Sequence, residues 1–295
     1  MAPSLTIVVT CTDRKSLPVT QRLRFRALPP GTPAERSENW RARLKLGAER
    51  RPLASLYQGE QWKASLALAD VARGEGFQPR LVVASAGLGL QALETQAPAY
   101  SATFSLGKPD AVADNTTDAA NWWAQLAHHG RALRLASLRG PVLLVLSRNY
   151  ALPLADDLVE LSATGPDAVL VGGAAGIPGM TRVPADATLR RALGGTLSSL
   201  NQRMANRFLQ LSHGPSDWLS QAHFRRWNSW ASRSRHTEVF DRQRGSDREI
   251  KAWIRVLAAH RTISASAALR EYRSHGYACE QNRFGRLYRE VVMDR

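Results

Sequence analysis

LTIVVTCTDRKS, at residues 5–16, decides the fold class, because an apolar run leads directly into a polar turn. Three later stretches repeat the pattern: LVVA at 81–84, VLLVL at 142–146 and AVLV at 168–171, followed by SAGLGL, SRNY and GGAAGIPG. Each run is apolar at successive positions, as in strands that are buried on both faces. The sequence therefore predicts four buried strands.

Helix-like stretches separate these strands, at 61–73, 118–135 and 152–161. Strands that alternate with helices form a parallel sheet, since each helix returns the chain to the same end of the sheet. The predicted fold class is therefore α/β, a three-layer α/β/α arrangement around a four-stranded parallel sheet. Such sheets bind ligands at the carboxyl ends of their strands, where the four polar tails would gather.

The chain is expected to divide into three parts. They are an α/β domain at 1–185, a helical connector at 186–240 and a small helical domain at 241–295. A proline-rich basic insertion at 26–55 interrupts the α/β domain. This insertion suits contact with DNA phosphates, and a solvated loop is the equally favoured alternative.

Three short helices are expected in the last part of the chain. Ser246 and Glu249 have the spacing of a capping box that starts the first helix, and the others fall at about 264–274 and 280–292. The outer face of the last helix carries amides and guanidinium groups, and we expect four of them to contact DNA: Asn282, Arg283, Arg286 and Arg289. This pattern resembles a helix-turn-helix, whose last helix enters the major groove. A protein-interaction bundle is the alternative.

Charge points to a polyanionic partner. The 295 residues include 40 Lys and Arg against 25 Asp and Glu, a net charge of +15. Such a field attracts nucleic acid, and double-stranded DNA is the expected partner. Only five of the 40 basic residues are lysine, so a GC-rich genome is an alternative source of the arginines. The composition excludes a disordered or fibrous chain.

Several other classes of protein are not indicated. Two cysteines cannot build a disulfide framework or a four-cysteine zinc site. His213 and His223 lack the spacing of a helical metal pair, and no phosphate-binding Gly-x-x-x-x-Gly-Lys-Ser/Thr motif occurs. No signal peptide and no membrane-spanning run are evident. We therefore expect a cytoplasmic protein with no cofactor, no metal and no membrane contact.

Two carboxylates are candidates for catalysis. Asp13 lies where the first strand ends, so it could direct water or stabilise a developing positive charge. Asp110 is the second candidate, in a loop that follows the second strand. The alternatives are a helix cap or an ion pair for Asp13 and a turn cap for Asp110. Cys11 has no base near it in the sequence and is expected in the core.

Further residues are candidates for binding a flipped-out base or its strand. For the base they are Tyr57, Ser85, Gly87, Tyr100, Phe104 and Asn149. The aromatic rings could stack on a base, and core packing is their alternative role. For the DNA backbone the first strand and the insertion supply Arg14, Lys15, Arg41 and Arg43. Tryptophans interleaved with basic residues at 211–236 suit either nucleic-acid binding or a buried stripe.

The strand tails resemble those of the uracil-DNA glycosylase superfamily. VVTCTDRK places Asp13 where that family has an aspartate that assists hydrolysis. The chain departs from the family in three places: no Pro-Tyr follows Asp13, Ser85 stands where the family has an asparagine, and GGAAGIPGM lacks the family's histidine. The resemblance implies base excision without uracil specificity.

A narrower resemblance covers residues 5–125. Cys-Thr-x-x-Lys at Cys11–Lys15, LYQGEQW, SAGLGL and YSATF are similar to Brig-type DNA glycosylases of phage-defence loci. That family excises glucosylated hydroxymethylcytosine from T-even phage DNA. The resemblance therefore implies modified phage DNA as the substrate and an abasic site as the product.

Two other functions stay open. The Cys-Thr-x-x-Lys run also resembles the core domain of archaeosine synthase, which implies a 7-deazaguanine-type transferase that acts on tRNA or DNA through Lys15 or Cys11. The other function is a non-enzymatic regulator whose last helices bind an operator. Binding of structured RNA distinguishes the first function, and a short specific DNA footprint distinguishes the second.

Overall fold

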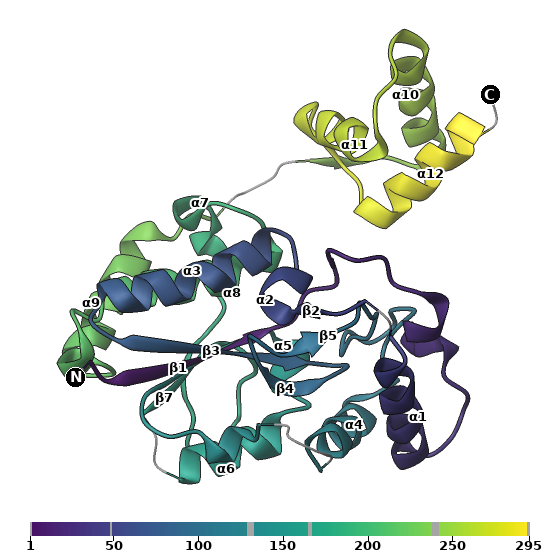
Figure 1. The fold of residues 1–295 in the computed structure, drawn as a ribbon. Helices are drawn as coiled ribbons and strands as arrows, with labels where there is room; N and C mark the ends of the chain where they lie inside the picture. Colours follow the sequence, from purple (N-terminus) through teal and green to yellow (C-terminus); the bar gives the residue numbers. More distant parts are fainter. Residues whose placement is uncertain (1, 48, 129–132, 165–166, 238–241, 294–295) are drawn as a thin grey trace. The chain divides into compact units, whose positions relative to one another are not determined.

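The computed structural model describes residues 2–47, 49–128, 133–164, 167–237 and 242–293. The chain forms two compact units, Met1–His236 and Thr237–Arg295 (Figure 1). Each unit has its own apolar core. The segment from residue 186, expected as a separate connector, packs within the first unit, because the buried side chains of Met204, Phe208 and Leu209 join the core around the sheet.

The first unit is built on a six-stranded sheet in the order β4-β3-β1-β6-β7-β8. These strands are β4 Gly89–Ala92, β3 Gln78–Ser85, β1 Ser4–Thr10, β6 Val142–Leu146, β7 Ala168–Gly172 and β8 Thr181–Val183. All neighbours pair in parallel except β3 and β4. Val8 of β1 pairs with Val82 on one side and Leu144 on the other, so the first strand lies at the centre.

The four predicted strands are present and parallel, but the expected total of four is wrong. A three-residue turn after Ser85 reverses the chain into β4, and Gly89 takes the positive φ of 74° that such a turn favours. The strand β4 has four residues and begins in the glycine-containing segment after β3, and β8 has three residues. Strands of this length are too short to show a strand periodicity in the sequence.

Helices cover both faces of the sheet, so the three-layer α/β/α class holds (Figure 1). The helices on one face are α3 Glu60–Gly74 and α8 Leu200–Gln210, with α9 Gln221–Ser234 packed on α8. On the other face are α4 Thr116–His128 and α6 Ala155–Ala163, with α1 Pro33–Lys45 packed on α4. The shorter elements are β2 Arg51–Pro52, α2 Leu53–Leu56, β5 Gln96–Ala97, α5 Arg148–Ala151 and α7 Arg190–Leu193.

The second unit is a three-helix domain. Its elements are β9 Gln243–Arg244, α10 Asp247–His260, α11 Ala265–Ser274, β10 Tyr277–Ala278 and α12 Gln281–Met293. The predicted capping box is confirmed, since the Ser246 side chain accepts from the Glu249 N–H and the Glu249 carboxylate accepts from the Ser246 N–H. Ile254, Tyr272 and Phe284 meet in its core. No helix in the described ranges of either unit has the length and apolar character needed to span a bilayer.

Glu60 joins α3 to α8. Its carboxylate accepts from the Ser199 hydroxyl at 2.8 Å, the Arg203 guanidinium at 2.9 Å and the Thr196 N–H at 3.1 Å. The bonds from Ser199 and Arg203 are the main cause of its low pKa, which falls from 4.5 to about 2. Ionised Glu60 therefore fastens the start of α3 to the beginning of α8.

This low pKa predicts a pH-dependent stability. Because the pKa is depressed in the folded state, the stabilisation is complete above the unfolded value of 4.5 and is lost as the pH falls toward 2. We expect Glu60→Gln to lower the urea midpoint at pH 7 and to remove this part of the acid dependence. Urea unfolding between pH 7 and pH 2 measures both effects. The matched control is Glu38→Gln, an exposed position on α1; equal acid profiles for wild type and Glu60→Gln would contradict the assignment.

Candidate active site at the carboxyl edge of the sheet

The carboxyl ends of β1 and β6 mark the position where this sheet is expected to bind a ligand. In the sheet, β1 lies between β3 and β6. The chain runs from β1 to β3 on one side and from β6 to β7 on the other side. The connections after β1 and β6 therefore run in opposite directions, and open α/β sheets bind ligands between two such strands. Cys11 follows β1 and Tyr150 belongs to α5, directly after β6. The Cys11 Sγ and the Tyr150 hydroxyl, 3.0 Å apart, connect the two strand ends.

Three of the predicted site residues are exposed at these strand ends. Asp13 and Arg14 follow β1, and neither side chain makes a hydrogen bond or ion pair with another described residue. Asn149 follows β6 and donates one amide hydrogen bond to the Ser105 hydroxyl at 3.2 Å. A carboxylate, a guanidinium and an amide are thus accessible to a ligand at the edge.

Lys15 lies behind Asp13, with its side chain turned inward. Its Nζ donates to the carbonyls of Thr12 at 2.7 Å and Asp13 at 3.1 Å. The same nitrogen lies 4.8 Å from the centre of the Tyr100 ring and 5.2 Å from that of Tyr57. Burial lowers the pKa of this amine, while the neighbouring Cys11 and Asp13 act in the opposite direction. Lys15 therefore stabilises the loop that carries Asp13. Its amine is turned inward, whereas the sequence suggested an exposed contact with a DNA phosphate.

A chain of hydrogen-bonded hydroxyl groups lies beneath the edge. The Ser85 hydroxyl oxygen accepts from the N–H groups of Gly87 and Leu88, both at 3.1 Å. With both lone pairs occupied, Ser85 must donate its proton to the Tyr100 hydroxyl. The Tyr100 and Tyr57 hydroxyls are hydrogen-bonded in turn, at 2.5 Å.

The expected base-stacking rings are in the core. Tyr57, Tyr100 and Phe104 are at most 2% exposed, so none presents a free face to a base. Burial raises the pKa of Tyr57 and Tyr100, which keeps their hydroxyls protonated. The sequence shows that these residues are aromatic, but not that other aromatic rings pack against each of them.

Ser85 and Gly87 also have internal roles in place of the expected contact with a base. Ser85 is fully buried. A Cβ at residue 87 would lie 2.5 Å from the Tyr100 ring, so Gly87 makes room for a side chain and not for a ligand. Trp40 and Trp122 fix the same turn, since their indoles donate to the Gly87 and Ala86 carbonyls, both at 2.7 Å.

Asp110, the second catalytic candidate, is buried and bonded to other parts of the protein, so its carboxylate has a structural role. It is 8% exposed, and its carboxylate accepts from the Arg26 N–H at 3.2 Å. The guanidinium groups of Arg24 and Arg26 each lie 3.8 Å from it. These contacts join the basic insertion to the loop after β5. Asp13 is therefore the exposed candidate of the two.

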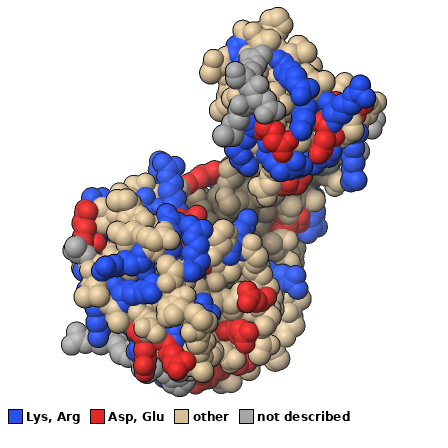
Figure 2. All heavy atoms as spheres, turned by 90° about the vertical axis from the view of Figure 1, so that its right-hand side faces the viewer, with Lys and Arg blue, Asp and Glu red and all other residues tan. Residues whose placement is uncertain are grey.

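The segment from Arg14 to Arg51 carries much of the positive charge. It contains 11 Lys and Arg against three Asp and Glu, which is +8 of the total of +15. Figure 2 views the first unit from the side where α1 lies and shows basic side chains in its upper part and acidic side chains among those lower down. Arg41 and Arg43, expected at DNA, use their guanidinium groups internally, on the carbonyls of Ser37 at 3.3 Å and Ala27 at 2.8 Å.

The predicted DNA contacts of α12 fall into two groups. Arg283 and Arg286 form ion pairs with Asp247 at the start of α10, at 2.6 Å and 3.2 Å, and these pairs lower the pKa of Asp247. Asn282 and Arg289 are exposed and line a shallow pocket with residues of α11. Of the four α12 residues expected to contact DNA, two are engaged in ion pairs with Asp247, and Asn282 and Arg289 remain exposed without such a pair among the described residues.

The hydroxyl chain predicts a cost for removing its central member. Tyr100→Phe breaks the bonds to Ser85 and Tyr57 without changing the ring, and it leaves buried hydroxyls without partners. We expect the free energy of unfolding to fall by about 1–3 kcal/mol, measured by urea denaturation. Tyr277→Phe, on an exposed ring of the second unit, is the matched control. A loss below 0.5 kcal/mol, an order-of-magnitude limit for a neutral surface change, would contradict the chain.

Sequence reasoning missed Tyr150 and the inward direction of Lys15. A tyrosine directly after the third predicted strand was the available signal, since strand ends meet at one edge. No three His, Cys, Asp or Glu residues lie together as a metal site would require within the described ranges. No family model matches the chain, and no curated protein or solved structure matches it.

Proposed function

We propose that this protein is a DNA glycosylase that excises a modified base from double-stranded DNA and leaves an abasic site. The observation that carries the proposal is the exposed Asp13 carboxylate at the end of the central strand, on a loop whose backbone carbonyls at Thr12 and Asp13 accept from the Lys15 amine. The proposed fold relationship is to the uracil-DNA glycosylase superfamily. The short motifs that resemble those of Brig-type glycosylases support glucosylated hydroxymethylcytosine in phage DNA as the proposed substrate, and the proposed place of action is the cytoplasm.

Asp13 supplies the chemistry in this proposal. Cleavage of an N-glycosidic bond develops positive charge on the sugar, and a nearby carboxylate stabilises it and directs water to C1′. The target nucleotide must leave the duplex to reach the carboxylate. Because the tyrosines are buried, the exposed Arg14 and Asn149 are the polar groups placed to contact the flipped-out nucleotide.

Binding of the duplex is assigned to two basic surfaces. One is the segment from Arg14 to Arg51, where Arg14, Arg22 and Lys45 are exposed and their side chains make no ion pair with another described residue. The other is the face of α12 with Asn282 and Arg289. The first supplies attraction that is independent of sequence, and the second has side chains that read base edges.

Three duplexes test the proposal: unmodified, hydroxymethylated at cytosine and glucosylated. Each is incubated with the purified protein and assayed for released base and for aldehyde-reactive abasic sites. Abasic sites on glucosylated DNA alone establish both the reaction and the substrate. No release from any duplex, with tight duplex binding, would replace the proposal with a DNA-binding regulator.

One observation favours a second candidate, the 7-deazaguanine-type transferase. Burial lowers the pKa of the Lys15 amine, and an amine that loses its proton becomes a nucleophile. This candidate requires Lys15 to leave the carbonyls of Thr12 and Asp13. Weak binding of all three duplexes with tight binding of structured tRNA would favour it over the glycosylase.

A further inference from the structure

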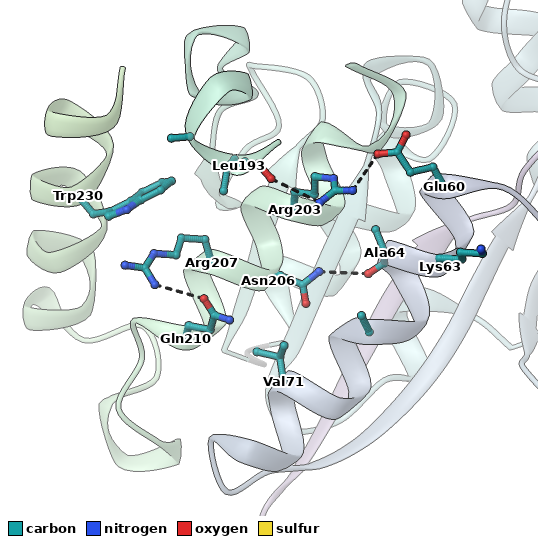
Figure 3. A pocket seen from close by; sticks show the side chains of 12 residues that line it. Glu60, Lys63, Ala64, Val71, Leu193, Arg203, Asn206, Arg207, Gln210 and Trp230 are labelled. Atoms are coloured by element: carbon teal, nitrogen blue, oxygen red, sulfur yellow. Dashed lines mark hydrogen bonds and ion pairs between the residues drawn. The ribbon is translucent and has the colours of Figure 1, made fainter. Parts of the chain in front are cut away.

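A pocket of about 590 Å³ lies in the helical layer of the first unit, apart from the edge with Asp13. Residues of α3, α7, α8 and α9 line it (Figure 3). Its volume is in the range of pockets that hold small organic ligands. Trp230, one of the tryptophans interleaved with basic residues in the sequence, also lines the pocket. Trp218 and Trp227, from the same stretch, are buried in the core.

Arg207 and Trp230 form one side of this pocket. Figure 3 shows Arg207 reaching from α8 toward Trp230 of α9, and the guanidinium carbon lies 5.2 Å from the indole centre. One terminal nitrogen, Nη1, donates to Gln210 at 3.3 Å. The Nε is buried and has no hydrogen-bond partner. This guanidinium therefore has hydrogen-bonding capacity that no described residue uses.

The charges of the pocket favour an anion. Its one carboxylate, Glu60, is paired with Arg203. Arg207 has no acidic partner among the described residues, and Lys63 is exposed at the rim without one. The pocket therefore keeps a positive charge beside an aromatic ring.

The opposite side offers an apolar surface and a buried, unpartnered amide oxygen. The small side chains of Ala64, Ala67 and Val71 line the pocket from α3. The Asn206 amide nitrogen donates to the carbonyls of Ala64 and Gln202, and its oxygen is left without a partner. An apolar strip of small side chains suits the flat face of a heterocycle.

We propose that this pocket binds a nucleotide, with the phosphate at Arg207, which lies over the Trp230 ring, and the base against the apolar strip of α3. Arginine binds phosphate through charge-assisted hydrogen bonds, and the flat face of a base packs on apolar side chains. The nucleotide comes either from solution or from a single strand of nucleic acid, since both present the same phosphate and base. The proposal is independent of the reaction at Asp13.

Calorimetric titration of the full chain tests this with dAMP, deoxyadenosine, inorganic phosphate and a ten-residue oligo(dA). We expect dAMP to bind about tenfold more tightly than deoxyadenosine or phosphate alone, since the complete ligand uses both halves of the pocket. Tenfold tighter binding of oligo(dA) than of dAMP would assign the site to a nucleic-acid strand, and equal binding would assign it to a free nucleotide. No binding of either at 1 mM, an order-of-magnitude limit for a specific site, would overturn the proposal.

Variants locate the binding. Arg207→Gln is expected to weaken dAMP binding about tenfold. Trp230→Leu is expected to weaken it about as much, because the ring that holds the Arg207 guanidinium is lost, while Trp230→Phe retains binding because a ring remains. Arg225→Gln, an exposed charge on the same helix α9, is the matched control and is expected to change affinity less than twofold. Arg207→Lys keeps the charge if Arg207→Gln proves unstable. Equal loss in Arg225→Gln and Arg207→Gln would show general attraction by positive charge and would overturn the proposed pocket.

Discussion

Replacement of Asp13 by asparagine is expected to reduce base release from modified duplex DNA by at least about 100-fold, the usual loss when one transition-state contact is removed. The amide occupies the same space but cannot offset the positive charge that develops on the sugar. Because Asp13 is exposed and its side chain has no partner among the described residues, the fold should not change. Single-turnover release of the base measures the effect.

The same variant should bind duplex DNA with an affinity within about twofold of wild type, because the basic surfaces that attract phosphates are intact. Asp70→Asn is the matched control, since Asp70 is exposed on α3 and pairs with Arg73. It should release base at the wild-type rate. If Asp13→Asn released base at the wild-type rate but bound duplex DNA more weakly, Asp13 would not be the catalytic carboxylate.

Removal of the second unit, residues 237–295, is expected to weaken duplex binding by tenfold or more, about what the loss of two phosphate contacts produces at moderate salt. The first unit should remain folded, because its core is separate from that of the second unit. The deletion removes 12 basic and eight acidic residues, only +4 of the net charge of +15. Lost contacts, and not lost net charge, would therefore cause the main effect.

The salt dependence of binding separates these two causes. The slope of log K against log salt should fall by about one for each phosphate contact that the deletion removes. Arg289→Ala in the full chain is the smaller version of the same test, with Arg261→Ala, an arginine engaged by Glu271, as its control. An unchanged slope after the deletion would mean that the second unit serves a partner other than DNA.

The local features of this fold could be predicted from the sequence. The four central strands, the capping box at Ser246 and the three C-terminal helices all follow from contacts within a few residues of the chain. The position of Asp13 after a buried strand belongs with them, because a strand that ends in polar residues carries them to the edge of the sheet.

Which side chains remain accessible at that edge was decided only by the tertiary structure. Tyr57 and Tyr100 are 43 residues apart, yet they share a hydrogen bond that removes both from the surface. Asp110 is buried by arginines 84 residues or more before it, and Lys15 turns inward over rings supplied by two other segments. Aromatic, acidic and basic residues have the same local preferences in a binding site and in a core. Their fate depends on distant partners that exclude water, and this chain brings those partners together only when it folds.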